Sequence, residues 1–140
     1  MDIRRTPRIG DVYLMRFTGT GSEQAGWRPG VVFQNNVGNA HSPNVIALPM
    51  TTSLKKLGQP THVLLNAAAN GLRRDSVVLC ENPERVSKER LGEYLTSLPH
   101  GEMARIAAAN LLATAAIAYL DADRLAELRE EAATLNGMAS

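Results

Sequence analysis

The chain has 140 residues, a formal net charge of +1 and a hydrophobic content of 44%, which exclude two ordinary domains and a wholly disordered chain. No apolar run approaches the ~18 residues that span a bilayer, and no apolar segment follows the charged start. We therefore expect a cytoplasmic protein with no secretory signal and no membrane partner. The single cysteine, Cys80, excludes an intrachain disulfide and a cysteine-rich zinc site.

Charge is unevenly distributed along the chain. Residues 1–70 carry seven Lys and Arg against three Asp and Glu, a net charge of +4, and residues 71–140 carry eight against eleven, a net charge of −3. A basic first half suits a polyanion, but the small number of lysines and phenylalanines argues against a general nucleic-acid coat. Charge therefore supports one confined anion-binding patch.

The first two-thirds of the chain predicts short strands. β-branched and aliphatic runs bounded by Gly, Pro, Asn and Asp are typical of strands joined by turns. These runs cover residues 11–17, 30–35, 44–50, 61–66 and 75–81, and a last strand is expected at 93–98 after a helical turn at 88–91. Several runs are continuously apolar, which favours central strands of a closed or highly curved sheet.

The pattern changes to helical spacing after Gly101. From there to Leu120, apolar residues recur at helical intervals in an alanine-rich background of high helix propensity. A second helix is predicted over residues 123–136, with an apolar face made of Leu125, Leu128, Ala132 and Leu135. Strands followed by helices predict an α+β domain, a small barrel-like sheet with a C-terminal helix.

The segment GSEQAGWRPG, residues 21–30, concentrates polar groups between two predicted strands. Arg28 precedes Pro29, which restricts the arginine backbone to an extended conformation and holds the guanidinium at a strand end. Guanidinium is always charged and presents a planar donor fork suited to phosphate. Further hydrogen-bonding groups for a ligand come from Ser22, Glu23 and Gln24. An ordinary hairpin loop is the alternative interpretation.

Longer motifs follow one another along the chain: GDVYLMRF, GSEQAGWRPGVVFQNNVGNAHSPNVIALPMTTSLKK, QPTHVLL and GLRRDSVVLCE. In order and spacing, from about Gly10 to about Leu120, they resemble the MazF/PemK toxins of bacterial toxin–antitoxin pairs. The resemblance implies a small SH3-like or CcdB-like β-barrel with a C-terminal helix, in a homodimer. We therefore expect a MazF/PemK-like toxin domain over residues 1–120 and an extra helical tail over residues 121–140.

The resemblance also implies a catalytic pair, the arginine of the RP motif and a threonine at the end of the third strand. These are Arg28 and Thr51, with the adjacent Thr52 as an alternative hydroxyl. RNA carries its own nucleophile, the 2′-hydroxyl, so the protein need only hold the phosphate and stabilise its developing charge. Arginine has a pKa above ~12, so electrostatic stabilisation is its expected role. We expect 2′,3′-cyclic phosphate and 5′-OH ends, with neither metal nor cofactor.

A second polar cluster follows in QNNVGNAHSPN. Its amides and hydroxyl suit the exposed edges of unstacked RNA bases, and the candidate RNA-binding residues are Gln34, Asn35, Asn39 and Ser42. The alternative is that Asn-rich segments make turns through side-chain hydrogen bonds to the backbone. Trp27 can stack on a base or pack the loop.

Other reactive residue types are interpreted as structural. His62 has no nearby Ser, Cys or second His, Lys55 and Lys56 suit a solvated edge, and Cys80 suits a buried core thiol. Pro83 departs from the family pattern and removes a strand hydrogen bond, which puts base contacts from that segment in doubt.

The resulting hypothesis is a sequence-specific endoribonuclease toxin that cleaves single-stranded RNA and is inhibited by a protein antitoxin. The alternatives are a CcdB-like inhibitor of DNA gyrase, because the same barrel hosts that activity, and a catalytically silent relative. The presence of both Arg28 and Thr51 favours the nuclease. For the acidic tail helix, we weigh docking on the toxin domain or its dimer mate against competition with RNA.

Overall fold

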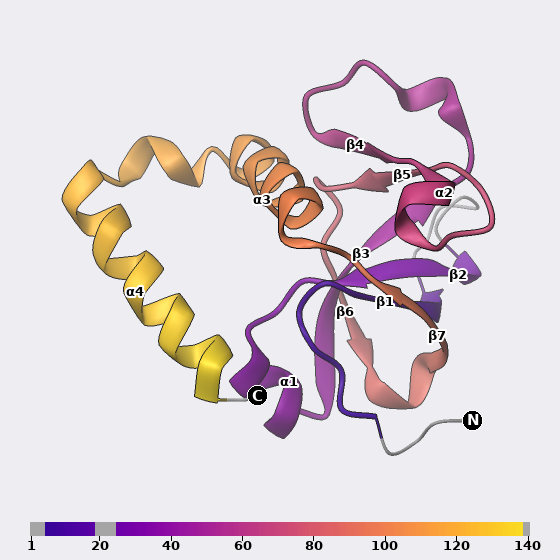
Figure 1. Ribbon diagram of the computed structural model, residues 1–140, viewed down its shortest axis with the longest axis horizontal. Coiled ribbons are helices and arrows are strands. Elements are labelled where there is room, and N and C mark those ends of the chain that lie inside the picture. Colours follow the sequence, from indigo (N-terminus) through magenta and orange to yellow (C-terminus); the bar gives the residue numbers. More distant parts are fainter. Residues whose placement is uncertain (1–4, 19–24, 139–140) are drawn as a thin grey trace.

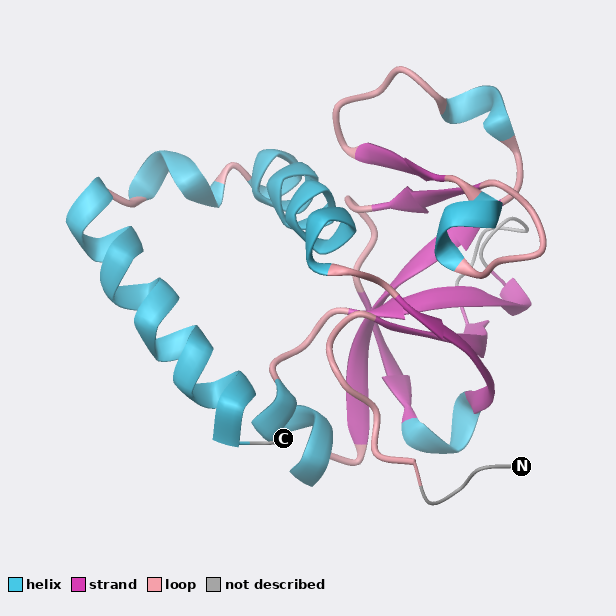
Figure 2. Cartoon of the chain, in the orientation of Figure 1, coloured by secondary structure: helices cyan, strands magenta, loops and turns pink. Residues whose placement is uncertain are grey.

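The computed structural model describes residues 5–18 and 25–138. Its strands are β1 (Asp11–Thr18), β2 (Ala25–Val32), β3 (Asn44–Thr51), β4 (His62–Leu65), β5 (Ser76–Leu79), β6 (Glu84–Ser87) and β7 (Leu91–Ser97) (Figure 1). Its α-helices are α1 (Asn36–His41), α2 (Ala67–Asn70), α3 (His100–Thr114) and α4 (Ala122–Met138), and single 3-10 turns are η1 (Leu54–Lys56), η2 (Lys88–Arg90) and η3 (Ala116–Tyr119). The strands gather on one side of the molecule, and α3 and α4 lie on the other (Figure 2).

The described strands form one antiparallel sheet in the order β4-β5-β3-β2-β1-β7, with β6 also paired to β3. The strand β3 changes partner along its length. Its first half pairs with β6, where Ala47 lies opposite Glu84, and its end pairs with β5, where Thr51 lies opposite Val77. The sheet therefore divides into two wings that diverge from β3.

The α+β class is confirmed, but the sheet is open where a closed barrel was expected. In the described part of the chain the two ends of the strand order, β4 and β7, are not paired with each other. Ile106 and Ala109 of α3 pack in one core cluster with Val12 of β1 and Val63 of β4. The helix α3 therefore packs on core side chains of both β1 and β4, which are not paired with each other in the sheet.

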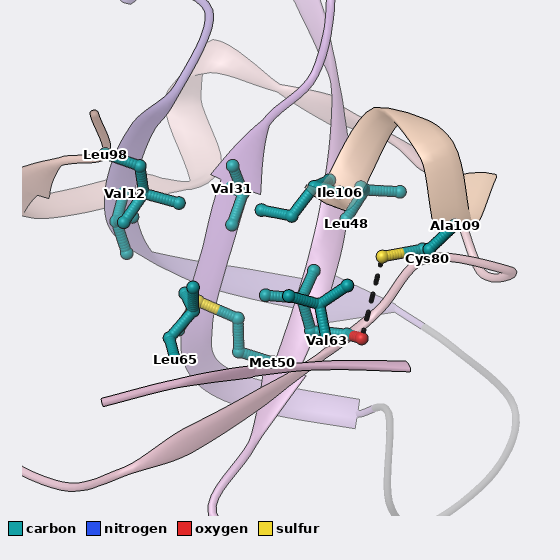
Figure 3. Close-up of a cluster of buried hydrophobic side chains, with 11 residues drawn as sticks. Val12, Val31, Leu48, Met50, Val63, Leu65, Cys80, Leu98, Ile106 and Ala109 are labelled. Carbon is teal, nitrogen blue, oxygen red and sulfur yellow. Dashed lines mark hydrogen bonds between the residues drawn. The ribbon is translucent and has the colours of Figure 1, made fainter. Parts of the chain in front are cut away.

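The interior consists of two apolar clusters on opposite faces of the central strands. Neighbouring residues of a strand point to opposite faces, so Val31 belongs to the first cluster and Val32 to the second. The first cluster lies beneath α3, and Figure 3 shows its side chains, including the buried Cys80. The second cluster includes Met15 of β1 and Ala47 of β3 and lies within the curved β6-β3-β2-β1 part of the sheet.

Two boundaries differ from the sequence predictions in ways that matter for the site. The strand β2 covers residues 25–32, whereas a strand was predicted over 30–35. Arg28 is therefore a strand residue, held by pairing with β1. The predicted helix to Leu120 stops at Thr114, because Ala115 adopts the left-handed conformation with φ of 58° and breaks the hydrogen-bond ladder.

The last helix, α4, returns to the start of the sheet. In Figure 1 its yellow end lies beside α1, and the backbone N–H of Asn36 donates to Asn136 Oδ1 at 3.0 Å. Leu125 and Leu128 are half-buried, and most other residues of α4 are exposed. Docking on its own domain, one of the two hypotheses for this helix, is thus observed at one end of α4. Within the described residues, no helix combines the length and apolarity that crossing a membrane requires.

Candidate functional site

The strand β2 presents Arg28 on the face of the sheet that carries the second core cluster. Because side chains alternate, Arg28 shares this face with Gly30 and Val32. A Cβ atom on Gly30 would lie 2.8 Å from both Met15 Sδ and Phe17 Cζ, so only glycine lets these two side chains pack over the strand there. The half-buried Arg28 therefore lies on a strand with packed neighbours and not at the tip of a loop.

The guanidinium of Arg28 keeps an unused donor. Its Nη1 atom is buried and has no hydrogen-bond partner among the described residues. A buried donor without a partner costs about 1–3 kcal/mol. An anionic ligand that accepts a hydrogen bond from Nη1 removes this cost, so the arrangement favours a bound anion.

Thr51 lies at the end of β3 on the same face as Arg28. The pairing of β2 with β3 matches Gly30 to Pro49 and Val32 to Ala47. Continuing this register by two residues brings Thr51 level with Arg28, and strand alternation puts both on the same face. The Thr51 hydroxyl oxygen accepts a hydrogen bond from the backbone N–H of Ser53 at 3.1 Å. This bond leaves the hydroxyl hydrogen free to be donated to a ligand.

Thr52, the alternative hydroxyl, points away from Arg28. It lines a pocket of ≈ 490 Å³ together with Leu14 and Pro29, which lie on the opposite face of the β1–β2 hairpin. The geometry therefore favours Thr51 as the partner of Arg28 on the β2–β3 face.

Glu84, at the start of β6, is a further charged group near Arg28 that was not identified from the sequence. It lies opposite Ala47, on the face of the second cluster. Its Oε2 atom is buried and has no hydrogen-bond partner among the described residues. Burial raises the pKa of the Glu84 carboxyl, and the positive charge of Arg28 lowers it in part. No local motif marks this glutamate, because only strand pairing brings it to the arginine.

The second predicted cluster is a hydrogen-bonded structural unit. Asn39 is fully buried, and its amide nitrogen donates to Gln34 O at 2.8 Å and to Asn36 Oδ1 at 3.0 Å. The Gln34 amide nitrogen donates to Asn39 Oδ1 at 3.1 Å. The donors of both amides are thus used inside the chain.

The remaining members of that cluster shape the ends of α1. Asn35 is its N-cap residue, and its side-chain oxygen accepts from the backbone N–H of Gly38 at 2.9 Å. Ser42 follows the helix, and its hydroxyl accepts from the backbone N–H of Asn44 at 3.1 Å. These contacts match the alternative in which polar residues make turns.

The predicted RNA-binding residues Ser22, Glu23 and Gln24 lie outside the described residues. Trp27 is 54% exposed and lies opposite Arg16 on β1. A Cβ atom on Gly92 would come within 3.0 Å of the Trp27 ring, so the indole packs across the edge of β7 while one part stays in solvent.

The other reactive residue types occupy ordinary positions. His62 Nε2 lies 2.7 Å from Glu81 Oε2, and Lys55 is exposed. Burial, with a smaller contribution from Glu81, raises the pKa of the Cys80 thiol to about 12, so the thiol is unreactive at neutral pH. No group of three or more His, Cys, Asp and Glu in the described part of the chain has the arrangement of a metal site.

Solved structures similar to this one include endoribonucleases and MazF toxins. An endoribonuclease from a mycobacterial species is 26% identical, with a TM-score of 0.66 over 81% of this chain and 95% of that protein. A second mycobacterial endoribonuclease, solved in complex with its cognate antitoxin, is 28% identical. Its TM-score is 0.66 over 79% of this chain and 96% of that protein. The MazF of Deinococcus radiodurans is 27% identical, with a TM-score of 0.66 over 77% of this chain and 96% of that protein.

Sequence comparisons agree with the structural ones. Endoribonuclease MazF of Staphylococcus epidermidis is 42% identical over 100 residues, which is 71% of this chain and 83% of the relative. Endoribonuclease EndoA of Bacillus subtilis (strain 168) is 40% identical over 98 residues, which is 69% of this chain and 84% of the relative. Residues 8–113 match the PemK-like, MazF-like toxins of type II toxin–antitoxin systems, and the chain belongs to this family.

Proposed function

We propose that this endoribonuclease toxin cleaves single-stranded RNA with Arg28 and Thr51 as its catalytic pair. The observation that carries the assignment is their shared position on one face of β2 and β3, with a buried and unused donor on Arg28. Endoribonuclease activity itself follows from the family and from relatives at 40% identity or more that are named endoribonucleases.

The proposed reaction uses a nucleophile that RNA supplies. The 2′-hydroxyl loses its proton and attacks the adjacent phosphorus, the bond to the 5′-oxygen breaks, and that oxygen takes up a proton. The products are a 2′,3′-cyclic phosphate and a 5′-OH end. Arg28 stabilises the charge that develops on the non-bridging oxygens, and Thr51 donates a hydrogen bond to the same phosphate. Because these two donors supply the stabilisation, the mechanism needs no metal ion.

Recognition of bases is assigned to the β1–β2 connection. Ser22, Glu23 and Gln24 remain the predicted contacts, since their chain position is next to the strand that carries Arg28. Gln34, Asn35, Asn39 and Ser42 are better explained as the scaffold of α1, because their polar atoms bond within the chain. We therefore retain the first group as RNA-binding residues.

The biological setting is that of a type II toxin–antitoxin pair. A protein antitoxin inhibits the toxin, as one structural neighbour was solved with its cognate antitoxin. We propose a homodimer that acts on messenger RNA in the cytoplasm, with residues 1–120 as the toxin domain and residues 121–140 as a helical extension of it.

The test is cleavage of a mixed single-stranded RNA by purified protein in excess EDTA. We expect cuts at a limited set of sequences, with cyclic phosphate on the upstream product. The Arg28→Ala variant is expected to lose activity while remaining folded at the assay temperature, and Arg129→Ala on α4 serves as the matched control. Cleavage that disappears in EDTA contradicts the metal-free mechanism. Growth arrest with intact messenger RNA points instead to a gyrase-type target.

A further inference from the structure

Glu84 shares the face of the sheet that carries Arg28 and Thr51. It pairs with Ala47 on β3, and Thr51 follows four residues later on the same face of that strand. Burial raises the pKa of the Glu84 carboxyl and Arg28 lowers it in part, so the two charges lie within electrostatic range of each other. The three side chains thus enter one site from three different strands.

The offset along the strands is within the reach of these side chains. Phe17 pairs with Gly26, yet its Cζ atom would lie 2.8 Å from a Cβ atom placed on Gly30, four residues away. Side chains on this face therefore lean along the strands. An extended arginine side chain is at least as long as that of phenylalanine, so Arg28 can approach Glu84 over a similar offset.

Arg28 and Glu84 each keep one buried polar atom unused. In the described part of the chain, neither Arg28 Nη1 nor Glu84 Oε2 has a hydrogen-bond partner, and the two residues do not form an ion pair. Nη1 can only donate, and an oxygen of an ionised carboxylate can only accept. A phosphate oxygen suits the first atom and is repelled by the second. A hydroxyl group accepts from the first and donates to the second, so the pair fits a hydroxyl.

RNA brings a hydroxyl group to this position. The attacking 2′-hydroxyl is next to the scissile phosphate, and a guanidinium has five N–H donors, enough to serve both. This hydroxyl must lose its proton as it attacks. A guanidinium cannot take the proton, because it stays protonated throughout the working pH range, and the neutral hydroxyl of Thr51 is a poor base. The carboxylate of Glu84 is the group on this face that can accept it.

We propose that Glu84 is the general base of the reaction and takes the proton of the attacking 2′-hydroxyl. As this proton moves to the carboxylate, the 2′-oxygen forms its bond to phosphorus. The bond to the 5′-oxygen breaks, and that oxygen takes a proton from water. Glu84 then returns its proton to the solvent, so the cycle consumes none. The inference rests on the proposed RNA cleavage with Arg28 as the phosphate-binding residue.

The surroundings of Glu84 make its ionisation readable from a pH profile. The charged or titratable residues that face it from neighbouring elements are Arg28, Tyr13 of β1, Tyr94 of β7 and Arg90 of η2. None of these is a carboxylate, and β3 presents no ionisable side chain on this face. The carboxylate of β1, Asp11, accepts hydrogen bonds from Arg5 and Ser97 at the other end of that strand. Arg16 and Arg85 point to the opposite face.

The first experiment measures single-turnover cleavage of an RNA with one preferred site, from acidic to neutral pH. The wild-type rate is expected to rise as Glu84 ionises and then to level off, with the rise centred above the ordinary carboxyl pKa because burial raises the pKa of Glu84. Glu84→Gln is expected to lose this pH dependence and at least ~10²-fold in rate, the lower end of what a general base contributes.

Two variants control for the chemical change. Glu84→Asp keeps a carboxylate and is expected to retain the pH dependence and part of the rate. Glu89→Gln changes an exposed glutamate of η2 in the same way and is expected to behave like wild type.

Binding separates the chemical role from a structural one. Fluorescence anisotropy uses the same RNA, made uncleavable by a 2′-deoxy group at the scissile position. Glu84→Gln is expected to bind it at least as tightly as wild type, because the change removes a negative charge near the bound phosphate. Melting temperatures show that each variant is folded.

The second experiment assigns Glu84 to the attacking side of the phosphate. In a substrate with sulfur in place of the bridging 5′-oxygen, the leaving group is a thiolate, which departs without a proton. Glu84→Gln is expected to remain at least ~10²-fold slower than wild type on this substrate. A rate restored by sulfur would assign Glu84 to the leaving oxygen and contradict the inference.

The outcomes separate this inference from the function beneath it. If wild-type protein cleaves RNA and Glu84→Gln cleaves it at the same rate with the same pH profile, Glu84 is not the base and the proposed function stands. Faster cleavage by Glu84→Gln also contradicts the inference, because the carboxylate then only opposes the bound phosphate. Wild-type protein that does not cut RNA removes the proposed function as well.

Discussion

Two polar regions of this protein look alike in sequence and differ in how their hydrogen bonds are used. Around α1, the amides of Gln34 and Asn39 bond to each other and to the backbone. On the β2–β3 face, Arg28 keeps a buried Nη1 donor without a partner. Amides satisfied inside the chain stabilise a loop, whereas an unsatisfied buried donor is available to a ligand. Residue type identifies candidates for both roles, and hydrogen-bond partners separate them.

The largest expected effect is on catalysis and distinguishes two adjacent threonines. Thr51→Val is expected to lower the single-turnover cleavage rate by about 10²-fold, because it removes a donor to the developing phosphate charge. Thr52→Val makes the same chemical change on the opposite face and is expected to keep most of the rate. A slow Thr52→Val enzyme beside a fast Thr51→Val enzyme would reverse the assignment.

The next effect is on stability in the α1 region. Asn39→Ala is expected to lower the free energy of unfolding by about 1–3 kcal/mol, because buried partners of its amide are left unsatisfied. Urea unfolding measures this loss. The folded fraction should cleave RNA at the wild-type rate. Normal stability with impaired RNA binding would restore Asn39 as a recognition residue.

A pH-dependent effect is expected from Glu84. Burial raises its folded-state pKa above that of the unfolded chain, with Arg28 opposing the shift, so the ionised carboxylate destabilises the folded protein at neutral pH. This cost disappears as pH falls through the raised pKa. Glu84→Gln is therefore expected to be more stable than wild type near neutral pH.

The same comparison gives the control for Glu84. The stability difference between Glu84→Gln and wild type should shrink below the ordinary carboxyl pKa, when the glutamate is protonated in both folded and unfolded chains. Thermal unfolding across the acidic range measures the difference. A gap that widens on acidification contradicts the raised pKa.

The smallest expected effect concerns α4. Asn136→Ala removes the hydrogen bond from the backbone N–H of Asn36, and we expect a loss of about 0.5–1.5 kcal/mol in stability. RNA affinity is expected to stay the same, since α4 packs chiefly against α1. Tighter RNA binding after truncation at Leu120 would favour the competing hypothesis, in which the acidic helix opposes RNA.

The sequence was informative where local chemistry decides the structure. Short β-branched and aliphatic runs located most strands, and helical spacing located α3 and α4. The motif containing Arg28 could be singled out from its residues, whereas the threonine pair in MTT was predicted only through the family resemblance. The N-terminal boundary of β2 was missed, because glycines and polar residues predict a loop while pairing with β1 imposes a strand.

Long-range pairing accounts for what sequence reasoning missed. Glu84 approaches Arg28 only because β6 pairs with β3 and β3 with β2. The packing of α3 against Val63 of β4 likewise joins segments far apart in the chain. Neither feature has a local pattern. The Asn-rich segment allowed recognition and turn formation equally, and only the hydrogen bonds of the folded chain distinguish them.

The most direct test of the central claim is a double-mutant cycle on Arg28 and Thr51, measured by single-turnover cleavage of one RNA site. If both donors act on the same phosphate, the Arg28→Ala and Thr51→Val double variant should lose little more than the more damaging single change, so the two effects are far from additive. Two effects that multiply independently, or a double variant that still cuts at the wild-type rate, would contradict the assignment of this face as the catalytic centre.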